Sequence, residues 1–125
     1  MTAALVATFL FLHGLVHLPV WLARAGGDEP FAPRRSWALA AAGLPPARVV
    51  SATAVGLASV TAVLYIVAGA ATAVRSSGWA TAALLAAAVG LVLKAVWFNP
   101  WLSLGALLDV GVITAVLTDW PASLY

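Results

Sequence analysis

Residues 2–23 read TAALVATFLFLHGLVHLPVWLA, a stretch of 22 residues without lysine, arginine, aspartate or glutamate. A helix needs about 20 apolar residues to cross the bilayer core of about 30 Å. The stretch is too long for the apolar part of a cleaved signal peptide, and no basic segment precedes it. We therefore predict that it forms a membrane-spanning helix.

The same criterion divides the remaining sequence into three further spans. Charged residues bound apolar stretches at about 49–74, 78–98 and 101–118. These stretches lack the alternating polarity of β-barrel strands, which favours helices. The chain is 64% hydrophobic and 8% charged, whereas a soluble domain is nearer half apolar and a quarter charged. The sequence predicts an all-α integral membrane protein, an up-down bundle of four helices that forms a single transmembrane domain over residues 1–125.

The connections between the predicted spans differ in length and composition. The first, residues 24–47, contains four prolines and reads as a loop. Its apolar insert at 36–44 is too short to span a bilayer, so we expect a short helix in the membrane interface, anchored by Trp37. The last two spans are joined tightly at Asn99-Pro100, where Asn99 is expected to cap the turn.

Aromatic and basic residues predict the membrane boundaries and the orientation. Tryptophans collect at membrane–water interfaces, and the span-flanking ones lie at predicted boundaries: Trp21, Trp97 and Trp101 on one face, Trp79 and Trp120 on the other. Basic residues favour the cytoplasmic side. Four arginines lie on the first connection against one on the opposite face: Arg24, Arg34, Arg35 and Arg48 against Arg75. We expect a multi-pass protein of the bacterial cytoplasmic (inner) membrane, with loop 24–47 cytoplasmic and both termini outside.

Four ionisable side chains fall inside the spans, where each is costly and needs an explanation. His13 and His17 are four residues apart and share one helical face. From the helical rise, His13 and Asp109 lie about 12 Å below the cytoplasmic interface, and His17 and Lys94 about 4–6 Å below it. We predict a polar intramembrane cluster of these four residues, with the charge of Lys94 snorkelling to the headgroups.

Small residues are expected to let the helices approach closely. Gly14 lies beside the two histidines, and Gly105 shares a helical face with Asp109. Elsewhere small residues recur every four positions, at Ala54/Ala58/Ala62, Gly69/Ala73 and Ala82/Ala86/Gly90. Their spacing is typical of helix packing in membranes.

Four interpretations of the polar cluster remain open. It could relay protons or bind a small solute. His13, His17 and Asp109 have the composition of a metal site with two histidines and one carboxylate. One histidine could bind haem as a single axial ligand, because both lie on one helix. The groups could also simply hydrogen-bond the first helix to the last. Nothing in the sequence requires a cofactor.

Other classes of function lack sequence support. The chain has no cysteine, no G-x-S-x-G or H-E-x-x-H motif and no phosphate-binding glycine loop. No basic run or base-stacking motif indicates nucleic-acid binding. We favour a small non-enzymatic membrane protein whose cluster organises the bundle and moves a proton or binds a small solute. The alternatives are a metal- or haem-dependent redox protein, and an accessory subunit of a larger membrane complex. The bilayer is the expected partner, with a homo-oligomer as a further option.

Residues 9–18, FLFLHGLVHL, resemble the opening of a group of small, uncharacterised bacterial four-span membrane proteins. That group looks as if it has an F-L-H-G-L-x-H-L first helix and a last helix in which asparagine follows glycine by four residues. The matching positions here are Gly105 and Asp109, so this chain has a carboxylate where an amide is usual. The resemblance covers the first and last helices and favours a hydrogen-bonding role at that position. DoxX-like membrane proteins are similar in topology only.

Overall fold

The computed structural model describes residues 1–22, 31–43 and 46–125. Four helices in this part of the chain are long and apolar enough to cross a membrane, the last one together with the short helix η1 (Pro100–Leu102) that precedes it. They are α1 (Thr2–Leu22), α3 (Ala47–Ala73), α4 (Trp79–Val96) and α5 (Ser103–Leu117). The predicted all-α four-helix bundle is confirmed, and the chain is a helical, multi-pass membrane protein.

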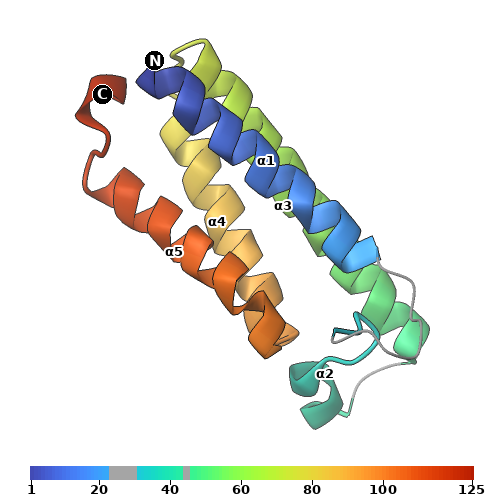
Figure 1. Cartoon of the computed structure of the whole chain (residues 1–125). Coiled ribbons are helices and arrows are strands. Elements are labelled where there is room, and N and C mark those ends of the chain that lie inside the picture. Colours follow the sequence, from blue (N-terminus) through green and yellow to red (C-terminus); the bar gives the residue numbers. More distant parts are fainter. Residues whose placement is uncertain (23–30, 44–45) are drawn as a thin grey trace.

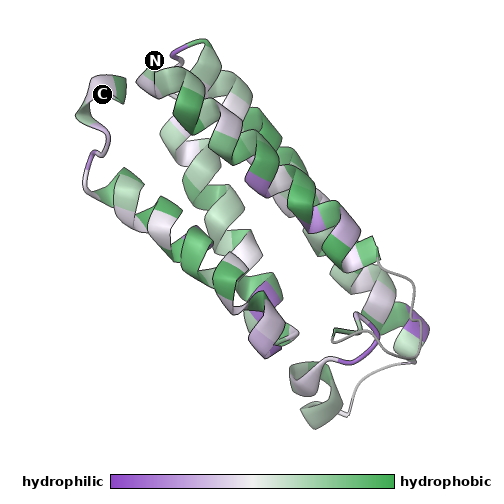
Figure 2. Ribbon diagram, in the orientation of Figure 1, coloured by the Kyte–Doolittle hydropathy of each residue, from purple (hydrophilic) through white to green (hydrophobic). Residues whose placement is uncertain are grey.

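The helices form a curved row rather than a closed square. α1 packs along α3, α3 along α4, and α4 along α5 (Figure 1). Both termini lie at one end of the bundle, and the short helix α2 (Trp37–Ala41) lies at the other. Figure 2 shows that the helices are mostly hydrophobic along their length. The row leaves a seam where α1 faces α5, and this seam matters for the site described below.

Small residues set the close packing of α1 against α3. A Cβ atom on Gly14 would lie 2.7 Å from the Cβ of Tyr65, and one on Gly69 would lie 3.1 Å from the carbonyl oxygen of Ala7. The Cβ at Gly14 would be closer than real Cβ atoms approach, so that position requires glycine at this helix spacing, and the contact at Gly69 is tight as well. The predicted small-residue row of α3 is fully buried: Ala54, Ala58 and Ala62. Ala73, by contrast, is exposed.

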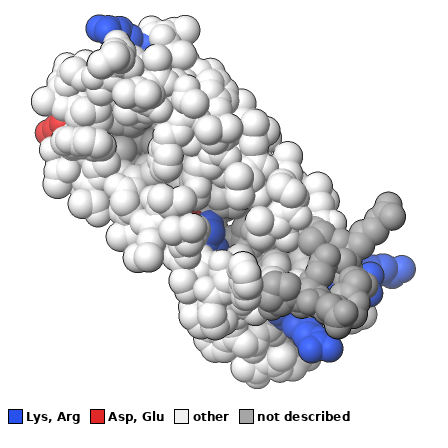
Figure 3. All heavy atoms as spheres, in the orientation of Figure 1, with Lys and Arg blue, Asp and Glu red and all other residues white. Residues whose placement is uncertain are grey.

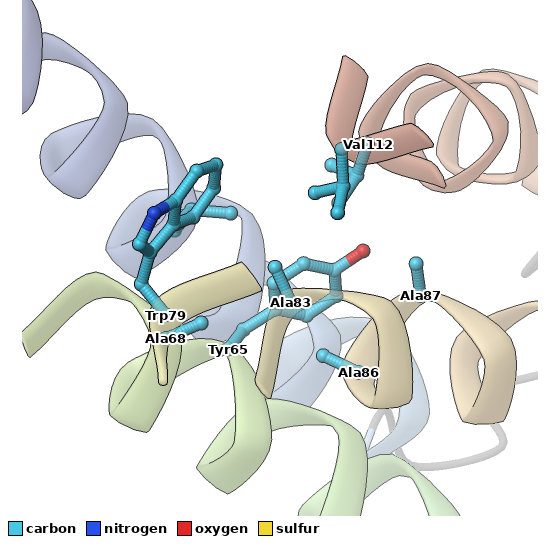
Figure 4. Packing of buried hydrophobic residues seen from close by; sticks show 9 residues of the cluster. Tyr65, Ala68, Trp79, Ala83, Ala86, Ala87 and Val112 are labelled. Carbon is cyan, nitrogen blue, oxygen red and sulfur yellow. The ribbon is translucent and has the colours of Figure 1, made fainter. Parts of the chain in front are cut away.

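Two apolar clusters fill the bundle. The one nearer the termini is built around Tyr65 and Trp79, with small alanines from α3 and α4 between them (Figure 4). The one at the opposite end contains Trp21, which packs edge-on against Phe31 and Trp97 with ring centroids 4.8 and 6.1 Å apart. The polar groups described below lie between these two clusters.

The first connection packs onto the C-terminal end of α4. The Ser36 hydroxyl donates to the carbonyl of Val96 at 2.6 Å, and the Trp37 indole donates to that of Ala95 at 2.7 Å. Carbonyls in the last turn of a helix have no partner within the helix, so this segment supplies the missing donors. α2 has five residues where about nine were expected. The predictions for residues 24–30 and 44–45, Arg24 included, lie outside the described part of the chain.

Three of the tryptophans at helix ends lie inside the protein rather than among headgroups. Trp21, Trp79 and Trp97 are buried, whereas Trp101 and Trp120 are exposed. The reason is clear at Trp97, whose indole N–H donates to the carbonyl of Pro33 at 2.9 Å. The protein itself therefore satisfies the polar atom that would otherwise seek the interface. Asn99 caps the turn before α5 as predicted, because its side chain accepts from the backbone N–H of Trp101 at 3.0 Å.

Candidate functional site

All four predicted intramembrane residues meet in the middle of the bundle, together with one that the sequence analysis missed. Each of the four long helices contributes at least one side chain. We call this group the polar cluster: His13 and His17 of α1, Tyr65 of α3, Lys94 of α4 and Asp109 of α5. Every member is at most 7% exposed, and Asp109 and Tyr65 are fully enclosed.

Asp109 is the centre of the cluster and accepts three hydrogen bonds. Its Oδ1 atom accepts from the Tyr65 hydroxyl at 2.6 Å, and lies 2.8 Å from Nε2 of His13. Its Oδ2 atom accepts from Nζ of Lys94 at 2.7 Å. These short distances are typical of hydrogen bonds to a charged acceptor. One carboxylate thus connects α5 to each of the other three long helices.

Lys94 points into the bundle, so the prediction that its charge snorkels to the headgroups is wrong. Its Nζ atom lies 2.9 Å from Nε2 of His17 and 3.5 Å from the carbonyl oxygen of Gly90, besides its bond to Asp109. The inward path exists because Gly105 has no side chain: a Cβ there would lie 2.7 Å from Cε of Lys94. The buried carboxylate then offers a partner of opposite charge, which the bilayer interior cannot.

Glycine also makes room for the carboxylate itself. A Cβ atom on Gly90 would lie 2.7 Å from Oδ2 of Asp109. Gly90 was identified in the sequence only as a helix-packing residue. Its position indicates a second role, because α4 must be small at this point for the Asp109 side chain to lie between α4 and α1.

The hydrogen bonds determine which nitrogen of His17 carries a proton. Nδ1 of His17 lies 2.9 Å from the carbonyl oxygen of His13, which can only accept, so Nδ1 must donate. Nε2 of a neutral imidazole is then an acceptor and takes a hydrogen bond from the Lys94 ammonium. By the same reasoning, Nε2 of His13 donates to Asp109. With both imidazoles neutral, the Lys94 ammonium and the Asp109 carboxylate are the two charges of the cluster, and they cancel.

Ring packing holds the cluster's side chains in place. The Tyr65 ring meets that of His13 edge-on, with centroids 4.7 Å apart, and the His13 ring meets that of His17 in the same way at 5.1 Å. Tyr65 was not predicted, because only charged and imidazole side chains were expected to need a partner inside the spans. A signal was available, since a phenol far from either end of an apolar span needs a partner for its hydroxyl group.

A metal ion would have to displace a cation that the protein already supplies. His13, His17 and Asp109 each offer one ligand atom, and these atoms lie within 4.8 Å of one another, as a metal site requires. The ammonium group of Lys94, however, lies 2.7 Å from Asp109 and 2.9 Å from His17. It takes the place of a metal cation between two of the three ligands. As arranged, the cluster fits an internal ion pair better than a metal.

A cavity of about 190 Å³ lies against the cluster. His13, His17 and Lys94 line it, together with Trp101 and apolar side chains of α1 and α5. Figure 3 shows basic side chains near both ends of the molecule, an acidic one near the end that carries the termini, and a small basic patch midway along the face. The cavity is smaller than the roughly 300–1,000 Å³ typical of pockets for drug-sized ligands, and therefore too small for a haem group.

Comparisons with protein-family models, with curated proteins and with solved structures found no match. Function is therefore inferred from the geometry of the polar cluster and of the cavities beside it.

Proposed function

We propose that the chain is a small, non-enzymatic membrane protein whose polar cluster holds the four spans together and binds a small uncharged solute. The observation that carries this proposal is the combination of one fully paired network from all four spans with a cavity directly beside it. Every buried side-chain nitrogen and oxygen in the described residues has a hydrogen-bond partner. Such complete pairing stabilises one helix arrangement against alternatives.

The apolar layer on one side of the cluster favours binding over translocation. Between the cluster and the end of the bundle that carries both termini, Thr72 is the one buried polar side chain among the described residues. Its hydroxyl donates to the carbonyl of Ala68 within the same helix. The Thr72 hydroxyl alone does not connect the cluster to that end, so the described residues offer no continuous chain of buried polar side chains for a proton relay through that half. We expect liposomes that contain the protein to show no proton flux above protein-free liposomes, measured with an entrapped pH dye.

The cluster also limits the chemistry of the solute. Its charges already cancel, so an ionic solute at this depth would be left without a counter-charge. Two N–H groups of Lys94 make short bonds, but the third is 3.5 Å from the Gly90 carbonyl, beyond the usual 2.7–3.2 Å. That N–H can be shared with a hydrogen-bond acceptor in the cavity. We therefore expect a small, uncharged molecule with a carbonyl or hydroxyl oxygen.

Cyclohexanone serves as a probe of this proposal. The protein, labelled with ¹⁵N at its two histidines and single lysine, is titrated with cyclohexanone in lipid nanodiscs while the ¹⁵N signals are followed by NMR. We expect saturable shifts of the Lys94 and His17 signals. Val16 lines the cavity, so Val16→Trp should abolish the shifts, whereas Leu15→Trp, at a neighbouring exposed position outside the lining, should retain them. Shifts that never saturate, or that survive Val16→Trp, would contradict the proposal.

The location and orientation follow from charge. Among the described residues, Arg34, Arg35 and Arg48 lie at the α2 end of the bundle and Arg75 at the other end. The positive-inside tendency supports a bacterial inner membrane protein with the first connection cytoplasmic and the termini outside.

Because the chain has no cysteine, single cysteines at exposed Ala42 and Ser77 test this orientation directly. A membrane-impermeant maleimide should label Ser77→Cys in intact cells and leave Ala42→Cys unlabelled. We also propose that the chain is related to the small bacterial four-span proteins that its first and last helices resemble.

A further inference from the structure

A second, larger cavity lies along the seam between α1 and α5. Its volume is about 450 Å³, and its walls are apolar side chains of α1, the start of α4, α5 and the segment that follows α5. Leu5 and Phe9 line one side, Leu107 and Gly111 the other, and Trp79 lies at the end near the termini. The volume is within the range of pockets for drug-sized ligands. We call this cavity the seam groove.

Specific residues shape the wall and the two ends of the seam groove. A Cβ atom on Gly111 would meet nothing within 4 Å, so α5 presents an open face to α1 there. At the terminal end, η2 (Ala122–Leu124) turns back onto α1, and the Tyr125 ring lies 5.4 Å from that of Trp79. At the other end, the hydrogen bond between His13 and Asp109 crosses the seam. The C-terminal segment therefore bounds the groove at one end, and the polar cluster lies beside its other end.

The seam groove and the polar cavity are neighbours, because Leu108 lines both. An apolar groove thus lies beside a cavity that has the donor Lys94 in its wall. From these observations we infer that the seam binds an uncharged, lipid-soluble molecule with one hydrogen-bond-accepting head and an apolar tail. The head lies in the polar cavity and the tail lies in the seam groove. This inference rests on the proposed function and names the class of molecule that the same site takes.

The burial of the polar cluster and its balanced charges favour an uncharged head over the charged headgroup of a phospholipid. The polar cluster is buried between the two apolar clusters of the bundle, and the charges of Lys94 and Asp109 in it cancel. A phosphate or other charged headgroup would be costly at that depth, whereas a carbonyl or hydroxyl group needs one donor. The tail requires no specific partner, since dispersion contacts with the apolar walls replace those that it makes with lipid tails.

The test uses a long-chain methyl ketone that carries a photoactivatable diazirine in its tail. Its matched control is the alkane of equal length with the same diazirine and no carbonyl group. Both are incorporated into dioleoylphosphatidylcholine vesicles that contain the protein, and labelled residues are mapped by mass spectrometry. We expect the ketone to label the walls of the seam groove saturably, with competition by unlabelled ketone. The alkane should label them at least about tenfold less.

Two glycine variants distinguish the groove from the rest of the lipid-facing surface. Gly111→Phe fills the seam groove and should reduce ketone labelling about tenfold. Gly56→Phe is the matched control: it lies on α3, which contributes no residue to the groove, and its Cβ would also meet nothing within 4 Å. It should label like the wild type. Labelling by the alkane equal to that by the ketone would mean that bulk lipid fills the groove and would overturn the inference, as would labelling unaffected by Gly111→Phe.

The cyclohexanone titration keeps this inference separate from the proposed function. Cyclohexanone is small enough to need only the polar cavity, so Gly111→Phe should still bind it. If cyclohexanone binds and the long ketone does not label the groove, the seam inference alone fails. If neither binds, the proposed function fails as well.

Discussion

α1 packs tightly against α3 but loosely against α5. Along α3, α1 packs at close glycine contacts: a side chain at Gly14 would collide with Tyr65, and one at Gly69 would press on Ala7 and Phe11. Along α5, α1 borders two cavities, of about 450 and 190 Å³. The first seam is held by close packing over its length. Across the second, the hydrogen bond from His13 to Asp109 is the direct polar tie among the described residues.

The difference shows how a small membrane bundle can stay ordered and still have room for a ligand. Within a bilayer, lipid tails compete with apolar helix contacts, so packing and hydrogen bonds decide which helices associate. Where packing is complete, the described residues of α1 and α3 make ring contacts at Tyr65 and no side-chain hydrogen bond to each other. Where packing is incomplete, a carboxylate with three donors connects the helices. The polar cluster thus substitutes for missing contacts at the open seam.

Removing the carboxylate should have the largest effect. Asp109→Ala leaves the Lys94 ammonium buried without its counter-charge, and breaking a buried ion pair in this way costs about 3–5 kcal/mol. We expect that loss in the free energy of unfolding, measured by denaturant titration in detergent micelles. Asp119→Asn changes an exposed acidic residue beyond the end of α5 and keeps a side chain that tolerates its positive φ. It should change the free energy of unfolding by less than about 0.5 kcal/mol. Equal effects of the two variants would mean that the open seam does not depend on Asp109.

Removing one donor should weaken the cluster less. Tyr65→Phe keeps the ring contacts with both histidines but removes the hydrogen bond to Oδ1 of Asp109. A hydrogen bond to a charged group contributes about 1.5–3 kcal/mol. Asp109 retains His13 and Lys94, so a loss near the lower end of that range is expected in the same unfolding assay. The ¹⁵N signal of His13 should shift as well, because its acceptor becomes more available; an unchanged signal would contradict the arrangement.

One added methyl group at Gly14 should loosen the packing of α1 against α3. Gly14→Ala places a Cβ 2.7 Å from that of Tyr65, and neither side chain can swing away because both atoms are fixed to the backbone. Overpacking of this kind costs about 1–3 kcal/mol. Gly56→Ala, whose Cβ meets nothing within 4 Å, should be neutral or slightly stabilising in the same assay. A neutral Gly14→Ala would show that α1 and α3 are not in close contact.

The fold could be predicted from the sequence because bilayer thickness sets the length of each apolar stretch. The helices Thr2–Leu22 and Ala47–Ala73 match the predicted spans closely. The inward direction of Lys94 could not be predicted, since it depends on space left by Gly105, a residue on another helix. The burial of Trp97 likewise depends on a carbonyl 64 residues away. Depth along a helix can be read from one stretch of sequence, whereas the direction of a side chain requires the neighbouring helices.

The central claim is that the charged side chains of α4 and α5 meet inside the bundle. The chain has one lysine and three aspartates, so the contact can be measured without ambiguity. Protein labelled with ¹⁵N at the lysine side chain and ¹³C at the aspartate carboxyl carbons is reconstituted in lipid bilayers. Solid-state NMR then measures dephasing of each carboxyl signal by the lysine nitrogen. We predict strong dephasing of one of the three carboxyl signals, and its disappearance in Asp109→Asn. Three signals without dephasing would show that Lys94 and Asp109 lie apart, and would contradict the polar cluster itself.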